Sequence, residues 1–136
     1  MKKITLILSS LFLSAACTSA PLDPSEIDPA FATQYLEYSE STLTTSLAKG
    51  PVLLNFHADW CPSCVALTKE LQKEISQAIP ANMTILEVDY DTEKELKKIW
   101  EIRLQHTLIQ LDQQGNEVTR WSGGNLATLK DQIIIN

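Results

Sequence analysis

Two cysteines separated by two residues, Cys61 and Cys64, constrain this chain more than any other feature. They follow the apolar run of residues 52–56, which is typical of a buried strand, and they precede a stretch with helical periodicity. The first thiol therefore stands at a helix start, where free N–H groups and the helix dipole lower the pKa of a cysteine. Its partner lies one turn further along, close enough to form a disulfide with it. The pattern predicts a dithiol/disulfide redox site at a strand-to-helix junction.

Two thiolates at this spacing can also provide half of a zinc site. A structural zinc site needs two more ligands, and the sequence has neither a second CxxC pair nor two histidines at ligand spacing. The remaining candidate ligands are His57, His106 and Cys17, and the last of these lies in a predicted targeting segment. The redox pair is therefore favoured over a structural zinc site.

The beginning of the chain predicts export from the cytoplasm. Two lysines precede an apolar stretch at residues 4–13, which is shorter than the ~20 residues of a membrane helix. Cys17 after two alanines resembles the acceptor site of bacterial lipoproteins, which would make residues 1–16 a signal peptide and Cys17 a lipid anchor. Ordinary cleavage would instead remove residues 1–20; the lipoprotein is favoured. Both alternatives predict the bacterial periplasm or cell envelope, where disulfide chemistry persists.

Length and charge limit the remaining possibilities. The chain of 136 residues has a net charge of −6, and the predicted leader contains two lysines and no acid. Nucleic acid is therefore not an expected partner. Residues 17–33 contain three prolines, which are expected to break any regular element, and they predict a tether. Residues 34–136 suit one compact domain.

Apolar periodicity and turn residues predict the elements of that domain. Strands are expected at residues 34–38, 52–57, 83–88, 108–111 and 118–121. Helices are expected at residues 41–49, 61–79 and 92–100, and after Asn125. Strand–helix–strand crossovers followed by a hairpin and a covering helix predict an α/β fold, with a central mixed β-sheet flanked by helices on both faces.

These features resemble the thioredoxin superfamily across residues 34–135. The resemblance rests on VLLNFHADWCPSC at residues 52–64, EVDYD at 87–91 and TLIQLD at 107–112. The ADWC segment is similar to extracytoplasmic thioredoxin-like domains that pass reducing equivalents from membrane electron carriers. The resemblance implies a thioredoxin-like fold and a thiol:disulfide oxidoreductase without a cofactor. It makes Cys61 the nucleophile, Cys64 the resolving thiol and Trp60 the aromatic flank of the site.

The chain departs from the family near the cysteines. Asn55 stands where many thioredoxins have a buried aspartate that relays the proton of the resolving thiol. An amide does not titrate, so the proton would need water, His57 or another group, although His57 is more simply a packing or solvated residue. Between the cysteines, Pro62 lacks an N–H, whereas Ser63 keeps its N–H and adds a hydroxyl beside Cys61. These changes shift the redox potential in a direction that the sequence does not give.

His106 stands where the family normally has a cis-proline facing the dithiol, just before Thr107. A cis bond before a non-proline residue costs about 3–4 kcal/mol, so we expect a trans bond after Gln105. The resemblance implies that this loop faces Cys61 and that the backbone of Gln105 can pair with a substrate peptide. A histidine there can stabilise a thiolate, deprotonate Cys64, bind metal or be an inert solvent-facing residue. The sequence leaves these roles open.

The leading hypothesis is a thiol:disulfide oxidoreductase, more in keeping with a reductase, that acts on cysteine-containing exported proteins. Its expected partners are a membrane electron donor and, through the lipid anchor, the membrane itself. One alternative is a copper chaperone that uses Cys61, Cys64 and His106 as metal ligands. The leading hypothesis itself expects no metal. Another alternative is a non-catalytic binding module. The sequence shows no flavin, haem or nucleotide site and has no glycine-rich phosphate loop.

Overall fold

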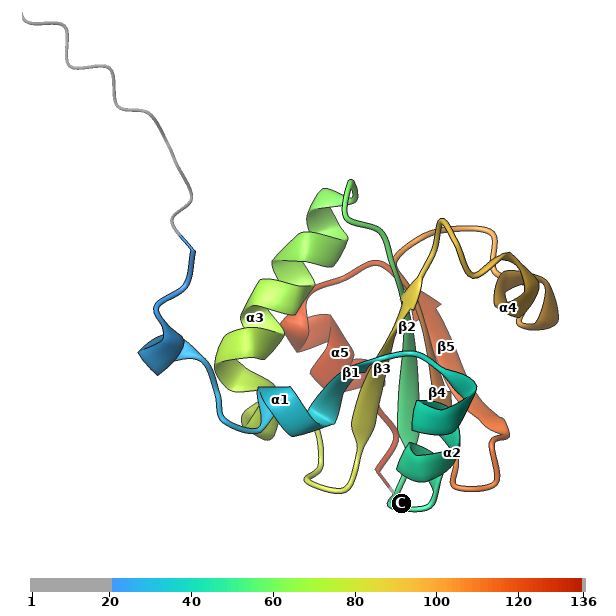
Figure 1. Ribbon diagram of the computed structural model, residues 1–136, viewed down its shortest axis with the longest axis horizontal. Helices are drawn as coiled ribbons and strands as arrows, with labels where there is room; N and C mark the ends of the chain where they lie inside the picture. The colour runs from blue at the N-terminus through green and yellow to red at the C-terminus, as the bar shows by residue number, and fades with distance from the viewer. Residues whose placement is uncertain (1–20, 136) are drawn as a thin grey trace, which may run out of the picture.

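A mixed β-sheet of five strands forms the centre of the protein in the computed structural model, which describes residues 21–135 (Figure 1). The strand order is β1-β3-β2-β4-β5. Strands β1, β3 and β2 are parallel, whereas β4 runs antiparallel to β2 and β5 antiparallel to β4. The predicted mixed sheet is confirmed. The strands are β1 (Tyr35–Glu37), β2 (Val52–His57), β3 (Thr84–Asp89), β4 (Thr107–Leu111) and β5 (Glu117–Ser122).

Helices cover both faces of this sheet (Figure 1). One face packs against α1 (Phe31–Gln34), α3 (Pro62–Ala78) and α5 (Leu126–Gln132), and the other against α2 (Glu40–Leu47) and α4 (Lys94–Ile99). Each face has its own apolar core. The sheet is therefore the middle of three layers, as predicted for the α/β fold.

Strand β2 lies between β3 and β4 and is buried along its whole length. Its side chains alternate between the two cores, with Leu53 on the α3 side and Leu54 and Phe56 on the other. Because both faces are covered, apolar side chains point to both of them, and only Asn55 and His57 on the α3 side interrupt the apolar run. Burial of each such side chain contributes about 1.5–3 kcal/mol. This firmly held strand leads the chain into the cysteine motif.

Helix α3 begins immediately after the motif's first cysteine. Cys61 is its N-cap and Pro62 occupies the first turn, where a missing N–H leaves no hydrogen bond unmade. Leu67, Leu71 and Ile75 form a buried stripe against the sheet, as the periodicity predicted. The packing of this stripe fixes the helix axis and hence the position of the two cysteines at its start.

Some of the predicted boundaries are wrong. Helix α2 begins at Glu40, one residue before the predicted start, because Ser39 caps it through a reciprocal capping box with Thr42. Helix α4 is shorter than expected because the Asp89 carboxylate accepts the backbone N–H groups of residues 91 and 92, which holds those residues in a turn.

The segment predicted as a tether contains ordered structure. A short 3-10 helix spans Pro24–Glu26, and α1 follows, so the expectation that prolines break any regular element is wrong there. The Asp28 carboxylate accepts from the N–H and hydroxyl of Ser76 on α3, at 2.9 and 2.5 Å, and the Phe31 ring stacks on Tyr35. Packing against the domain therefore begins near Asp28.

The predicted signal peptide and the lipidation site Cys17 lie outside the described residues. Within residues 21–135, no helix combines the length and the apolar character needed to span a membrane.

Candidate active site

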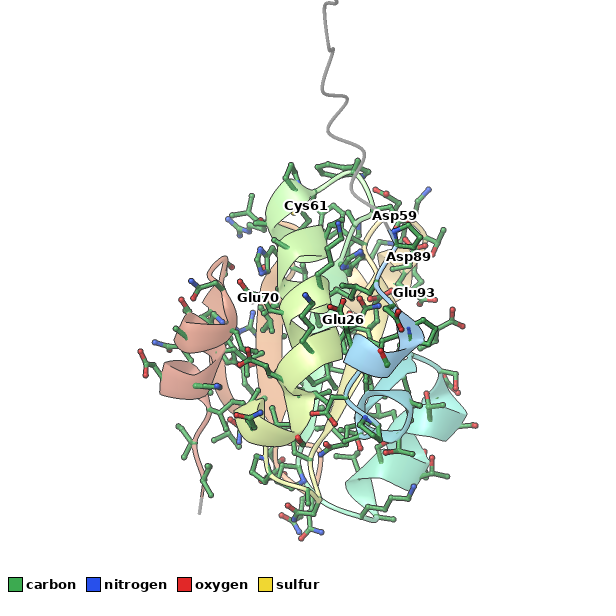
Figure 2. All side chains as sticks on the ribbon, turned by 90° about the vertical axis from the view of Figure 1, so that its left-hand side faces the viewer. Glu26, Asp59, Cys61, Glu70, Asp89 and Glu93 are labelled. Carbon is green, nitrogen blue, oxygen red and sulfur yellow. The ribbon has the colours of Figure 1, made fainter. Side chains whose placement is uncertain are left out.

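Cys61 lies at the N-terminal end of α3, at one end of the sheet (Figure 2), and Cys64 lies in the first turn of the same helix. Their thiols are free, and Cys61 and Cys64 are only 2% and 1% exposed. The backbone N–H of Cys64 donates to the Cys61 sulfur at 3.3 Å. The Cys61 sulfur thus acts as the helix cap, in the position where a thiolate meets unpaired N–H groups.

The surroundings of the two sulfurs separate their acidities. Burial alone would raise the pKa of the Cys61 thiol, but hydrogen bonds from the Cys64 thiol, the Ser63 hydroxyl and the backbone N–H groups of both residues lower it below its ordinary value. Burial, followed by the hydrogen bond to Cys61, raises the pKa of Cys64 to about 12. The thiolate therefore forms at Cys61, while Cys64 keeps its proton.

Ser63 links Cys61 to His106. The Ser63 hydroxyl oxygen lies 3.4 Å from the Cys61 sulfur and 2.8 Å from Nδ1 of His106. His106 is 3% exposed, so it is not the solvent-facing residue that was one of the open alternatives. Burial, followed by the charge of His57, lowers the pKa of its imidazole. A neutral imidazole thus stands at the end of a hydrogen-bonded chain to the nucleophile.

The backbone holds His106 in an unusual conformation. Its φ is 56°, in the left-handed region that few residues with side chains adopt, and the preceding peptide bond is trans as expected. Its N–H donates to the carbonyl of Phe56 at 2.7 Å, and its carbonyl accepts the N–H of Gly123 at 2.7 Å. These two bonds tie the loop to the end of β2 and to the segment after β5. The histidine ring is thereby placed beside the cysteines.

A second polar network lies next to Asn55. Its amide nitrogen donates to the hydroxyl of Tyr35 at 3.2 Å, and that hydroxyl donates to the carboxylate of Glu87. Burial, then the charge of Glu87, raises the pKa of Tyr35, so the hydroxyl stays protonated. Glu87 lies directly opposite Asn55 in the β2–β3 register. A carboxylate therefore lies near the amide that replaces the family's usual aspartate, but it belongs to the neighbouring strand.

Sequence reasoning missed the part that Tyr35 and Glu87 play in this network. The available signal was local: Glu87 is a charged residue inside a strand whose neighbours are buried. A charge at such a position needs a partner, which the sequence does not identify. His57, at the end of β2, is buried and lies 3.3 Å from Asp59 and 3.8 Å from Glu87.

The remaining predicted site residues surround the cysteines in different ways. Trp60 is 60% exposed, and its indole N–H donates to the carboxylate of Asp91 at 2.8 Å. Gln105 is half-buried in the loop before His106, and the buried Thr107 opens β4. The Thr107 hydroxyl donates to the Leu104 carbonyl. An anchored indole ring is thus available to a partner beside the dithiol.

An acidic cavity adjoins the motif on the β3 side. It has a volume of about 390 Å³, and six carboxylate residues line it together with His57 and Ala58. Figure 2 shows three of these residues, Asp59, Asp89 and Glu93, together on one side of α3. The protein surface next to the dithiol is therefore strongly negative. The six are Glu37, Asp59, Glu87, Asp89, Asp91 and Glu93.

Comparisons with known proteins agree with this fold. The sequence profile described as Thioredoxin matches residues 34–134. A thioredoxin of Chlamydia trachomatis serovar D is 35% identical over 85 residues, which cover 62% of this chain and 80% of that protein. A thioredoxin of Chlamydia pneumoniae is 33% identical over 85 residues, with the same coverage of 62% and 80%.

Solved structures show the same architecture. The crystal structure of Trxlp from Edwardsiella tarda superposes with a TM-score of 0.63 at 32% identity, covering 71% of this chain and 95% of that one. The oxidised thioredoxin of Plasmodium falciparum superposes with a TM-score of 0.59 at 21% identity, covering 71% and 91% of the two chains. The second likeness concerns the fold alone.

Proposed function

Because the chain belongs to the thioredoxin family, we propose that it is a thiol:disulfide oxidoreductase that reduces disulfide bonds in exported proteins. One contrast within the site supports this proposal above all. The pKa of the Cys61 thiol is lowered, whereas burial raises the pKa of Cys64 to about 12. A nucleophile and a resolving thiol need this difference, and a merely structural disulfide does not.

The reaction begins with the Cys61 thiolate. Its sulfur attacks one sulfur of the substrate disulfide, so that a mixed disulfide forms and the other substrate sulfur leaves as a thiolate, which then takes a proton. Cys64 next loses its proton and attacks the Cys61 sulfur, which releases the second substrate thiol. Two electrons have then passed to the substrate, and a Cys61–Cys64 disulfide remains. A dithiol of a second protein, which we propose to be a membrane electron donor, must reduce this disulfide again.

The second step needs a group that accepts the proton of Cys64. Asn55 cannot take this role because an amide does not titrate. A ring nitrogen of His106 lies within 4.8 Å of the Cys64 sulfur, and burial, then the charge of His57, lowers the pKa of that ring. A neutral imidazole is able to accept a proton near neutral pH. We assign this role to His106 in place of the family's usual carboxylate.

Substrate binding is proposed at the exposed surface around the motif. Trp60 and Leu104 are each 60% exposed and offer apolar contacts on two different loops. Gln105 lies between Leu104 and His106, and its backbone is suited to pair with an extended peptide. Such pairing recognises the backbone of the partner, so it suits an enzyme that acts on many different cysteine-containing proteins.

The place of action is proposed from the beginning of the sequence. Two lysines, an apolar stretch and Cys17 after two alanines support export to the bacterial periplasm or envelope and a lipid anchor. Expression of the full chain with radiolabelled palmitate tests the anchor. We expect label in the wild type and none in Cys17→Ser; equal label in both would reject the anchor at this residue.

The proposed activity is tested by the reduction of insulin with dithiothreitol as electron donor. The wild type should accelerate the reaction, and Cys61→Ser should lose the acceleration completely. Ser41→Ala, a change on the remote and exposed surface of α2, serves as control. An unimpaired Cys61→Ser protein would reject the proposal. The direction is tested by the reduction potential: a value near ~−270 mV supports a reductase, and one near ~−120 mV indicates an oxidant.

A further inference from the structure

Three metal-binding side chains meet at the start of α3. The sulfurs of Cys61 and Cys64 and one ring nitrogen of His106 all lie within 4.8 Å of one another. The three residues are 2%, 1% and 3% exposed. Within residues 21–135, no other three cysteine, histidine or acidic residues gather as closely. The cluster therefore differs from an ordinary surface group of polar residues.

These donors suit a thiophilic cation. Thiolates select copper(I) and zinc, and imidazole is a common ligand for both metals. Zinc–sulfur bonds are about 2.3 Å and zinc–nitrogen bonds about 2.0–2.1 Å, so three ligand atoms around one ion lie roughly 4 Å apart. The observed spacing of up to 4.8 Å permits this arrangement after small side-chain rotations.

Contacts with neighbouring residues hold the His106 ring in place. Nδ1 lies 2.8 Å from the Ser63 hydroxyl, and two backbone hydrogen bonds hold the residue at a φ of 56°. The other ring nitrogen, Nε2, is buried and has no hydrogen-bond partner among the described residues. A second hydrogen bond that fixes the ring and leaves one nitrogen free is characteristic of metal-binding histidines. A buried nitrogen without a partner is otherwise unfavourable.

We propose that the reduced protein binds one thiophilic cation, copper(I) or zinc(II), through the Cys61 and Cys64 sulfurs and the imidazole of His106. The cation replaces the two thiol protons, which are released to solvent, and no electrons are transferred. Disulfide formation removes both thiolates, so the oxidised protein loses the site. Metal binding and disulfide exchange thus exclude each other, and the redox state of the pair controls whether the cation is held.

The residue that creates this site is the histidine where the family normally has proline. Proline has no side-chain donor, and the two cysteines alone would offer only half of a four-ligand zinc set. With His106 the set has three ligands and an overall charge that suits a monovalent or divalent cation. This site uses the two cysteines of the proposed function but does not require that function to be correct.

The test is anaerobic titration of the fully reduced exported protein with copper(I), and separately with zinc(II), in competition with a chromophoric chelator. We expect one equivalent to bind with at least one of the two cations, which also identifies the ion. His106→Ala should weaken that binding at least tenfold, and the disulfide form should bind none. The control is Ser41→Ala on the remote and exposed surface of α2, which should bind as the wild type does.

Other outcomes would overturn the site. Stoichiometric binding that is the same in His106→Ala and wild type would exclude the histidine as a ligand. Equal binding by the disulfide form would exclude the two cysteines as ligands. If His106→Ala proves unfolded by circular dichroism, X-ray absorption of the loaded wild type decides, because the proposal requires two sulfurs and one nitrogen around the ion. Insulin reduction measured with a chelator present separates the two proposals: reduction without metal binding rejects only the metal site, and metal binding without reduction rejects only the oxidoreductase.

Discussion

Replacing Ser63 by alanine should raise the pKa of the Cys61 thiol. The Ser63 hydroxyl lies 3.4 Å from the Cys61 sulfur and is one of the groups that lower its pKa. A hydrogen bond to a charged group contributes about 1.5–3 kcal/mol. The low end applies because Cys64 also donates to the same sulfur through its backbone N–H at 3.3 Å.

The size of the shift follows directly. One pKa unit corresponds to about 1.4 kcal/mol, so loss of this hydrogen bond should raise the pKa by about one unit. At a pH below both values, the thiolate fraction then falls about tenfold. Because only the thiolate reacts, alkylation of Cys61 in Ser63→Ala should slow by about the same factor.

The assay is the rate of iodoacetamide alkylation of the reduced protein as a function of pH, with the modified residue identified by mass spectrometry. Ser63→Thr keeps the hydroxyl and should stay near the wild type, and Ser41→Ala on the remote α2 should not change the profile. An unchanged or lowered pKa in Ser63→Ala would show that the hydroxyl does not stabilise the thiolate.

Three further outcomes are expected. In Cys61→Ser, Cys64 should be alkylated at pH 8 far more slowly than a free cysteine, since burial raises its pKa to about 12 in the wild type; a rate like that of a free thiol would contradict this. Tyr35→Phe should lower the free energy of unfolding by about 1–3 kcal/mol in urea denaturation, because its hydroxyl joins the buried Asn55 amide to the half-buried Glu87 carboxylate and both lose their partner. Tyr38→Phe is the control, and equal stability of both variants would show that the network contributes nothing. Leu71→Ala, at a fully buried position of α3, should cost about 2–5 kcal/mol in the same assay, and a loss below about 1 kcal/mol would contradict its place in the core.

The central part of the fold could be predicted from the sequence because its signals are local. Strand β2 has the predicted bounds, since burial on both faces favours a nearly continuous apolar run. Helix α3 was predicted from its periodicity and from the motif that opens it. The packing of Asp28 against Ser76 was missed because it joins residues 48 positions apart, and prolines dominated the local pattern.

The site was only partly predictable for the same physical reason. The two cysteines are close in sequence, so their spacing on a helix determines their geometry. The hydrogen bond between Ser63 and His106 joins residues 43 positions apart and depends on the left-handed backbone of the histidine. The link between Asn55 and Glu87 runs through Tyr35 and depends on the register of β2 and β3. A strand that is buried on both faces has no alternating pattern from which that register could be predicted.

The most direct test of the central claim is to trap the intermediate. Cys64→Ser should attack a disulfide substrate through Cys61 and remain joined to it, because the resolving thiol is absent. Intact mass spectrometry after mixing with insulin, followed by peptide mapping, should find the mixed disulfide on Cys61 and none in the Cys61→Ser protein. A mixed disulfide that forms equally well in Cys61→Ser, or none in Cys64→Ser, would contradict the assignment of nucleophile and resolving thiol.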